Sequence, residues 1–180
     1  MRASLARAAA PIRLLISYPV RGGLRMGSRP TKAKTETAAE MVTYRGATYP
    51  WQCDHIGHMN IMWYVSKFDE ANWNLFARVG ITPSYLREAR YGMAGVQQNI
   101  TYKRELLAGD VIEVRSRILE VRERVIRFVH EMRNAERNEV AAICETTAVH
   151  LDRKTRKSCA FPPAVRMNAE KLSAQVLPQD

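Results

Sequence analysis

The sequence predicts an α+β domain in which a five-stranded antiparallel sheet wraps around one long central helix. Two observations carry this prediction. Hydrophobic residues recur at helical spacing between residues 61 and 79, and from residue 96 to residue 151 they mainly alternate with polar residues. A single helix cannot cover a flat sheet of that width, so the sheet is expected to curve around it.

The first elements are a strand and two helices. A short strand is expected over Thr43–Tyr49, closed by Pro50. In the long helix that follows, Asn60 is a suitable N-cap and Gly80 a suitable C-terminal stop. A short second helix is expected over 83–90, because a proline commonly occupies the first turn.

Four strands are predicted after the helices, over 96–103, 112–118, 126–133 and 140–151. The last is rich in Val, Ile, Thr and Ala, which is typical of a well-buried strand. Short connections predict that these four strands are antiparallel neighbours in chain order. The sheet is expected to keep a second apolar face that the helix leaves uncovered, which implies a homodimer or a homotetramer.

The two ends are predicted to lie outside the domain. Of the net charge of +10, residues 1–40 carry +6, from eight Lys/Arg and two acids. The predicted boundaries are a disordered basic tail at 1–40, the domain at 41–165 and a C-terminal tail at 166–180. The acid-free start resembles an organellar transit peptide, and a start codon upstream of the true one is the alternative. We therefore expect a cytoplasmic protein, or an organellar one if the tail is a transit peptide.

Composition also bears on the expected partners. Three cysteines at irregular spacing argue against a disulfide framework. No apolar run reaches the roughly 20 residues of a membrane span, so no membrane partner is expected. The basic excess lies mostly in the tail and forms no stripe with aromatic residues, so no nucleic-acid partner is expected. A mildly basic domain suits a ligand that carries several phosphates.

The chemistry is predicted in the stretch 51–60, Trp-Gln-Cys-Asp-His-Ile-Gly-His-Met-Asn, which runs into the long helix. It places the carboxylate of Asp54 on a loop just before a helix N-terminus. The free N–H groups and the dipole at that end can hold a developing oxyanion. A nearby carboxylate can attack a polarised carbonyl or activate a water molecule, and Gly57 lets the backbone approach a ligand closely.

This stretch resembles the 4-hydroxybenzoyl-CoA thioesterase-like branch of the hotdog superfamily. The matching segments continue on the helix and beyond it, and comprise Asp54, Gly57, His58, Asn60, Tyr64, residues 68–71 and residues 102–110. The resemblance implies a hotdog fold and an acyl-CoA thioesterase, which hydrolyses an acyl-coenzyme A to the free acid and CoA. It implies no separate cofactor, because coenzyme A is part of the substrate.

The resemblance also implies the roles of individual residues. Asp54 takes the position of the catalytic base or nucleophile, and the N–H near Ile61 takes the position that polarises the thioester carbonyl. His58 and Asn60 complete the predicted site, and His58 is expected to organise the loop. Relatives often carry a second acid where this chain has Gln52. The candidate ligands of the coenzyme A phosphates are Lys103, Arg104, Lys154 and Arg156.

Several alternatives stand beside this interpretation. Cys53, Asp54, His55 and His58 fit no compact zinc pattern, so no metal is expected. A hotdog-type enoyl-CoA hydratase would follow the aspartate with Asn-Pro-aliphatic-His, and this chain has no proline there. A non-catalytic acyl-CoA-binding protein is the third possibility. His130 is expected to be a core or interface histidine with its hydrogen bonds satisfied.

Overall fold

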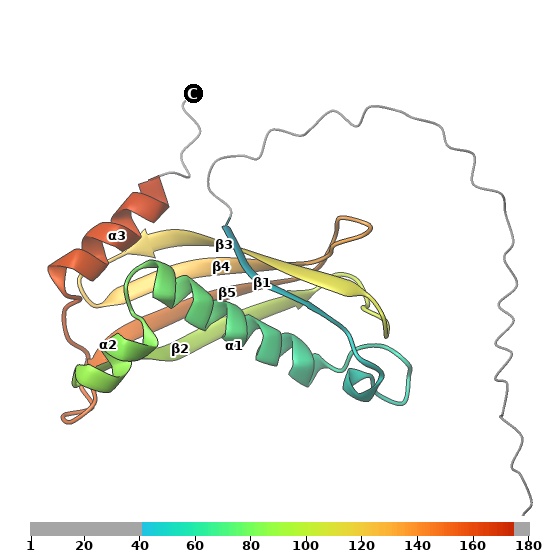
Figure 1. Cartoon of the computed structure of the whole chain (residues 1–180), viewed down its shortest axis with the longest axis horizontal. Helices are drawn as coiled ribbons and strands as arrows, with labels where there is room; N and C mark the ends of the chain where they lie inside the picture. The colour runs from blue at the N-terminus through green and yellow to red at the C-terminus, as the bar shows by residue number, and fades with distance from the viewer. Residues whose placement is uncertain (1–40, 175–180) are drawn as a thin grey trace, which may run out of the picture. The chain divides into compact units, whose positions relative to one another are not determined.

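The computed structural model describes residues 41–174, which form one curved antiparallel sheet with the long helix on its concave face (Figure 1). No helix in this part of the chain is long and apolar enough to cross a membrane. The elements are β1 (Met41–Ala47), the 3-10 turn η1 (Pro50–Gln52), α1 (Ile61–Arg78), α2 (Pro83–Glu88), β2 (Tyr91–Tyr102), β3 (Val111–Val121), β4 (Val125–Asn134), β5 (Glu139–Asp152) and α3 (Pro163–Ala174).

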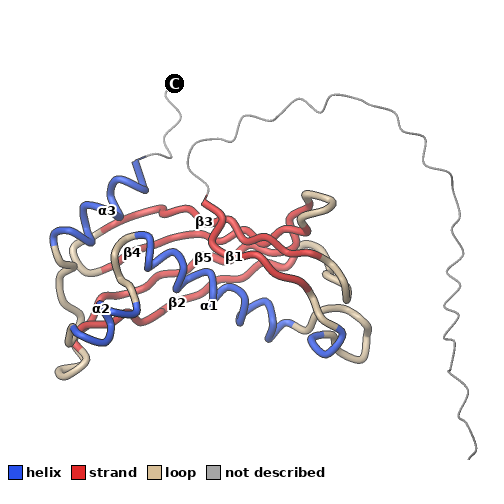
Figure 2. The backbone as a smooth tube through the Cα atoms, viewed as in Figure 1, coloured by secondary structure: helices blue, strands red, loops and turns tan. Residues whose placement is uncertain are grey.

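The strand order differs from the predicted one. The sheet runs β1-β3-β4-β5-β2, so β2 pairs with β5 and lies at the opposite edge from β1. The prediction that consecutive strands are neighbours was wrong for β2 and β3. Residues 103–110 between them are no tight hairpin, but a crossing that passes the end of the sheet near the start of α1 (Figure 2).

Helix α1 begins where predicted. The Asn60 side chain accepts a hydrogen bond from the N–H of Met62 at 3.1 Å, which confirms it as the N-cap. The core side of the helix is apolar, and the aromatic ring of Phe68 on this side is completely buried. Ile61 and Val65, predicted on this apolar stripe, are instead exposed.

Lys67 was predicted off the apolar stripe, yet its side chain is only 3% exposed. Its ammonium donates to the Tyr44 hydroxyl and to the carbonyl of Ala47, both at 3.1 Å, and it lies 5.3 Å from the centre of the Tyr44 ring. These acceptors compensate the loss of water around the charge. A lysine in the core side of α1 therefore fastens the helix to β1.

Regular secondary structure continues beyond residue 165, the predicted end of the domain. Residues 163–174 form α3, in which Val165 and Ala169 are buried in the second core cluster. The predicted C-terminal tail from 166 was therefore wrong as far as Ala174, because the small apolar residues at i and i+4 form a packing face. Residues 175–180 and the predicted tail at 1–40 lie outside the described residues.

We expect removal of residues 1–40 to leave folding and catalysis intact, because all five strands and the helices that the structure describes lie within residues 41–174. The truncated protein should match the full chain in its thermal midpoint and its rate of thioester hydrolysis. An insoluble product, or a folded one without hydrolysis, would contradict this prediction.

The outer face of the sheet, which α1 does not cover, carries charged side chains in pairs of opposite sign. Arg115 lies 2.7 Å from Glu113, and Arg133 lies 2.5 Å from Glu131. Assembly was predicted from the sequence on the assumption that this second face is apolar. That assumption was wrong, since ion pairs of this kind are well suited to contact with water.

Assembly into a dimer or tetramer stays a prediction. The surface formed by α1 and β2, and not the outer face of the sheet, now supports it. Exposed apolar side chains there include Trp73 of α1 and Val96 of β2, which line one pocket. Strand β2 is also an edge strand, with one row of backbone groups that β5 does not pair. We expect sedimentation at micromolar concentration to show a dimer or a tetramer. A single species of 20.5 kDa would count against it.

The buried imidazole of His130 should make the fold less stable in mild acid. Burial lowers the pKa of His130 from 6.5 to about 3. In the unfolded chain this imidazole binds a proton below about pH 6.5, whereas the folded protein excludes the proton until about pH 3. Its contribution to stability is therefore complete above pH 6.5 and is lost as the pH falls from 6.5 toward 3.

Over that window the free energy of unfolding should fall by about 1.4 kcal/mol per pH unit for this one proton. Urea unfolding at about pH 7.5 and about pH 5 measures the slope. The variant His130→Gln should lose this part of the slope, and the exposed His55→Gln should keep it. Burial also lowers the pKa of His150, which accounts for a remaining slope. Equal slopes in the parent and His130→Gln would refute this prediction.

Candidate active site

The loop that carries Asp54 is a small closed turn before α1. The Asp54 N–H donates to the carbonyl of His58, and the Gly57 N–H donates to the carbonyl of Asp54, both at 3.0 Å. Gly57 has a φ of 98°, a conformation that residues with a Cβ rarely adopt. Cys53 and Met59 pair across the base of the turn. The loop is thus held by its own backbone.

The Asp54 carboxylate accepts a hydrogen bond at one oxygen. The other oxygen, which we call the open oxygen, makes no hydrogen bond within the described residues and faces the His58 ring. Oδ1 of Asp54 accepts the N–H of Ile56 at 2.9 Å. Its Oδ2 lies 3.7 Å from Nδ1 of His58, and Nε2 of the same ring lies 3.8 Å from Oε1 of Glu105. His58 therefore sits between two carboxylates, one on the loop and one on the 103–110 crossing.

The start of α1 presents a backbone donor at Ile61. The N–H of Met62 is taken by the Asn60 side chain, and that of Trp63 by the Asn60 carbonyl at 2.9 Å. Among the described residues the N–H of Ile61 has no acceptor. Asn60, which the sequence placed in the predicted site, is thus the N-cap of the helix. Its own N–H donates to the carbonyl of Gln52 at 2.9 Å, and this fixes the approach of the chain.

Gln52, two residues before Asp54, is buried and has a structural role. Its side-chain oxygen accepts the N–H of Tyr49 at 2.9 Å and closes the turn η1. The second acid near Asp54 in this chain is Glu105, which comes from the crossing and was not predicted. Glu105 lies 51 positions after Asp54, and only the unexpected path of residues 103–110 brings it to the site.

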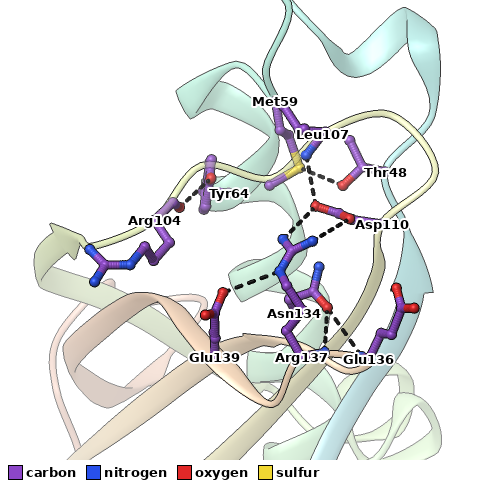
Figure 3. Close-up of polar contacts among 10 residues, drawn as sticks. All are labelled: Thr48, Met59, Tyr64, Arg104, Leu107, Asp110, Asn134, Glu136, Arg137 and Glu139. Carbon is purple, nitrogen blue, oxygen red and sulfur yellow. Dashed lines mark hydrogen bonds and ion pairs between the residues drawn. The ribbon is translucent and has the colours of Figure 1, made fainter.

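The crossing is anchored at both of its ends (Figure 3). Near its start the Tyr64 hydroxyl donates to the carbonyl of Arg104 at 3.3 Å, and burial raises the pKa of Tyr64 to about 12, so this donor keeps its proton. Near its end Asp110 accepts the N–H of Leu107 at 2.9 Å and pairs with Arg137 at 3.3 Å. The Met59 N–H donates to the carbonyl of Leu106 at 2.7 Å, which joins the crossing to the Asp54 loop.

Lys103 and Arg104 lie beside the helix start. They line a pocket of about 470 Å³ together with His58, Ile61, Tyr64, Tyr102 and Glu105. In Figure 3 the Arg104 guanidinium points away from the anchored network, and its Nη1 donates to the carbonyl of Lys103 at 2.9 Å. The structure thus brings two of the four predicted phosphate-binding cations to the pocket that His58 and Ile61 also line.

Lys154 and Arg156 are at the other end of the sheet. Residue Ala142 of β5 pairs with Tyr102 near the site, whereas Asp152 of β5 pairs with Tyr91. Ten residues of extended strand separate Ala142 from Asp152, which is about 33 Å. Within one chain these two cations therefore do not join Lys103 and Arg104.

Comparison with known proteins identifies the family. A family model described as the thioesterase-like superfamily matches residues 49–168, which include the Asp54 loop, α1 and all of β2 to β5. The chain belongs to this superfamily. The resemblance predicted from residues 54–60 and 102–110 is confirmed.

This thioesterase-like chain is 30% identical over 122 residues to an L-carnitine dehydrogenase/betainyl-CoA thioesterase of Agrobacterium fabrum. The match covers 68% of the chain but only 25% of that relative. Among solved structures, a hypothetical protein of Staphylococcus aureus in complex with CoA superposes with a TM-score of 0.72 at 17% identity, covering 79% of this chain and 90% of that one.

A Thermus thermophilus thioesterase complexed with coenzyme A and Zn gives a TM-score of 0.63 at 24% identity, covering 74% and 94% of the two chains. At this level of identity both structures show the fold alone. The prediction of a five-stranded hotdog fold around one long helix is therefore confirmed.

Proposed function

We propose that this thioesterase-like protein hydrolyses an acyl-CoA thioester to the free acid and coenzyme A, with Asp54 as base or nucleophile. One observation carries the proposal. A carboxylate with one open oxygen lies on a rigid loop that ends at a helix N-terminus, where the N–H of Ile61 has no partner among the described residues. Such a pair of groups serves attack on a polarised carbonyl.

In the proposed reaction the thioester carbonyl oxygen accepts the Ile61 N–H, which draws electrons from the carbonyl carbon. Asp54 takes a proton from a water molecule as the water oxygen bonds to that carbon. The carbon–sulfur bond then breaks, and the proton goes to the leaving sulfur to give the CoA thiol. In the alternative route the Asp54 oxygen itself bonds to the carbon, CoA leaves, and water hydrolyses the resulting anhydride.

His58 and Glu105 support this site in the proposal. The ring of His58 lies between the Asp54 and Glu105 carboxylates, so it fixes the direction of the open Asp54 oxygen. We assign the coenzyme A phosphates to Lys103 and Arg104, because these cations line the pocket at the helix start. Lys154 and Arg156 lie too far away in the same chain to share that task.

Release of free CoA thiol from a panel of acyl-CoA thioesters tests the proposal. The panel should include betainyl-CoA, because the Agrobacterium relative is named a betainyl-CoA thioesterase. A parallel assay follows hydration of crotonyl-CoA. Thiol release without hydration supports hydrolysis, whereas hydration without thiol release supports the enoyl-CoA hydratase. Tight acyl-CoA binding with neither reaction would indicate a binding protein. A cytoplasmic, homo-oligomeric enzyme completes the proposal.

A further inference from the structure

Three aromatic side chains meet at the surface near the start of α1. Tyr49 is 52% exposed and Trp51 is 64% exposed, whereas Trp63 of α1 packs partly against the core. The rings of Tyr49 and Trp51 stack with their centres 5.7 Å apart. The rings of Trp51 and Trp63 meet at 81° with their centres 4.9 Å apart. Trp51 and Trp63 thus form two walls at nearly a right angle, which we call the aromatic corner.

The backbone fixes one wall of the corner in place. The N–H of Gln52 donates to the carbonyl of Tyr49 at 2.9 Å, and the N–H of Tyr49 donates to the side-chain oxygen of Gln52 at 2.9 Å. Trp51 lies between these two residues in the turn η1. Because the turn is already ordered, a ligand that binds to the exposed ring loses little binding energy to ordering of the backbone.

The corner lies at the end of α1 where the thioester is proposed to bind. The carbonyl of Gln52 accepts the N–H of Asn60 at 2.9 Å, which holds the turn of Trp51 beside the helix start (Figure 1). Trp63 follows Ile61 by two residues, which is about 3 Å along the helix axis. The N–H groups of a first turn point out of the helix end. A carbonyl bound by Ile61 therefore lies beyond that end, near the corner.

The surroundings of the corner discriminate among ligands. The face of an aromatic ring attracts a cation, and tryptophan does so most strongly. In the proposed reaction the Asp54 carboxylate faces the thioester carbonyl, so a positive charge beside that carbonyl is attracted and a negative one is repelled. A primary ammonium would leave its N–H groups without acceptors against the rings, whereas a quaternary ammonium has no N–H to satisfy. The corner therefore suits a quaternary ammonium group.

Building on the proposed hydrolysis, we propose that the acyl group of the substrate carries a quaternary ammonium close to the thioester, and that the aromatic corner binds it. Trp51 and Trp63 supply the ring faces, and Tyr49 supports the Trp51 ring from behind. These residues determine specificity and contact no reacting atom. Asp54 and Ile61 keep the roles assigned to them above.

The first test uses two thioesters of the same shape. Betainyl-CoA, already in the panel, carries a trimethylammonium one methylene from the carbonyl, and 3,3-dimethylbutanoyl-CoA has carbon in place of that nitrogen. The ammonium also makes the thioester more reactive, so the ratio of the two kcat/KM values is compared between variants. We expect Trp51→Leu to lower this ratio by about tenfold. Trp51→Phe, which keeps a ring face, should lower it less.

Trp73→Leu is the matched control, because Trp73 is another exposed tryptophan of α1 that lies outside the corner. This variant should keep the parental ratio. Trp63→Leu tests the second wall and should lower the ratio as Trp51→Leu does. The Trp51 ring is largely exposed, so its replacement costs little packing and the test stands even if Trp63→Leu does not fold. Thermal midpoints establish which variants are folded.

The second test needs no catalysis. Tetramethylammonium should give a saturable change in tryptophan fluorescence in the parent and in Trp73→Leu, and none in Trp51→Leu. Uncharged tert-butanol, which is of similar size, should give no saturable change. Sodium chloride at equal ionic strength controls for salt. Tetramethylammonium should also compete with betainyl-CoA in the hydrolysis assay.

The outcomes separate the two proposals. If the parent hydrolyses no thioester, the proposed function fails and the substrate assignment falls with it, while the fluorescence titration still decides whether the corner binds a quaternary ammonium. If the parent hydrolyses thioesters but Trp51→Leu keeps the ratio, hydrolysis stands and the assignment of the corner is wrong. A changed sedimentation of Trp51→Leu at an unchanged ratio would assign the ring to a contact between subunits instead.

Discussion

Replacing Asp54 by asparagine should lower turnover by roughly two to four orders of magnitude while the protein stays folded. Asparagine has the same shape, and its side-chain oxygen can still accept the N–H of Ile56 that holds the loop at 2.9 Å. What is lost is the negative charge and the basicity of the open oxygen. Thioester binding should survive, because the Ile61 N–H and the pocket at the helix start are unchanged. Steady-state thiol release and a thermal midpoint measure the two effects.

His58→Ala is the matched comparison. If His58 only orients the Asp54 carboxylate from 3.7 Å away, its removal should cost less than Asp54→Asn and should affect both kcat and KM. Hydrolysis at nearly the parental rate by a folded Asp54→Asn variant would contradict the proposed role of Asp54 as base or nucleophile. An inactive His58→Ala beside an active Asp54→Asn would assign the base to the imidazole, and the hydratase would again become a competitor.

Ile61→Pro should lower kcat by about two to three orders of magnitude, because it deletes the one backbone donor assigned to the carbonyl. Proline is well tolerated in the first helical position, since its missing N–H has no partner there. The preceding Asn60 has φ −66° and ψ 145°, which is the extended conformation that a following proline favours. The Ile61 side chain is 63% exposed, so little packing is lost.

Ile61→Ala controls for the side chain, because it keeps the N–H and should retain most of the activity. Circular dichroism and the thermal midpoint establish that both variants keep α1. A folded Ile61→Pro with the kcat of Ile61→Ala would show that another group polarises the carbonyl. The pair thus tests the helix start without touching Asp54.

The sequence predicted those parts of the molecule that depend on neighbouring residues. The N-cap at Asn60, the long helix and the strands after it follow from spacing and capping preferences over a few residues. The Asp54 loop was also located, because its residues are contiguous and run directly into the helix. The family match over residues 49–168 confirms the resemblance that rested on this loop.

The errors concern contacts between distant parts of the chain. Neither the pairing of β2 with β5 nor the approach of Glu105 to His58 follows from any local pattern. Burial of Lys67 was missed because helical spacing alone marks a lysine as a surface residue, whereas Tyr44 and Ala47 supply its acceptors from another element. Asn72 was placed on the apolar stripe by its spacing, and only the structure shows its carboxamide between His130 and a pocket.

The strand order has a consequence for co-translational folding of the protein on the ribosome. β1 and α1 emerge first, but the partner of β1 is β3, with Met41 opposite Ser116, and the Asp54 loop meets its partner only at Leu106. β2 in turn waits for β5, the last strand to be synthesised. The apolar side of α1 therefore stays uncovered until nearly the whole domain has been translated, a period in which chaperones can bind it and proteases can cut it. The proposed catalytic loop, though encoded early, gains its contacts with the 103–110 crossing only after Leu106 and Leu107 have been translated.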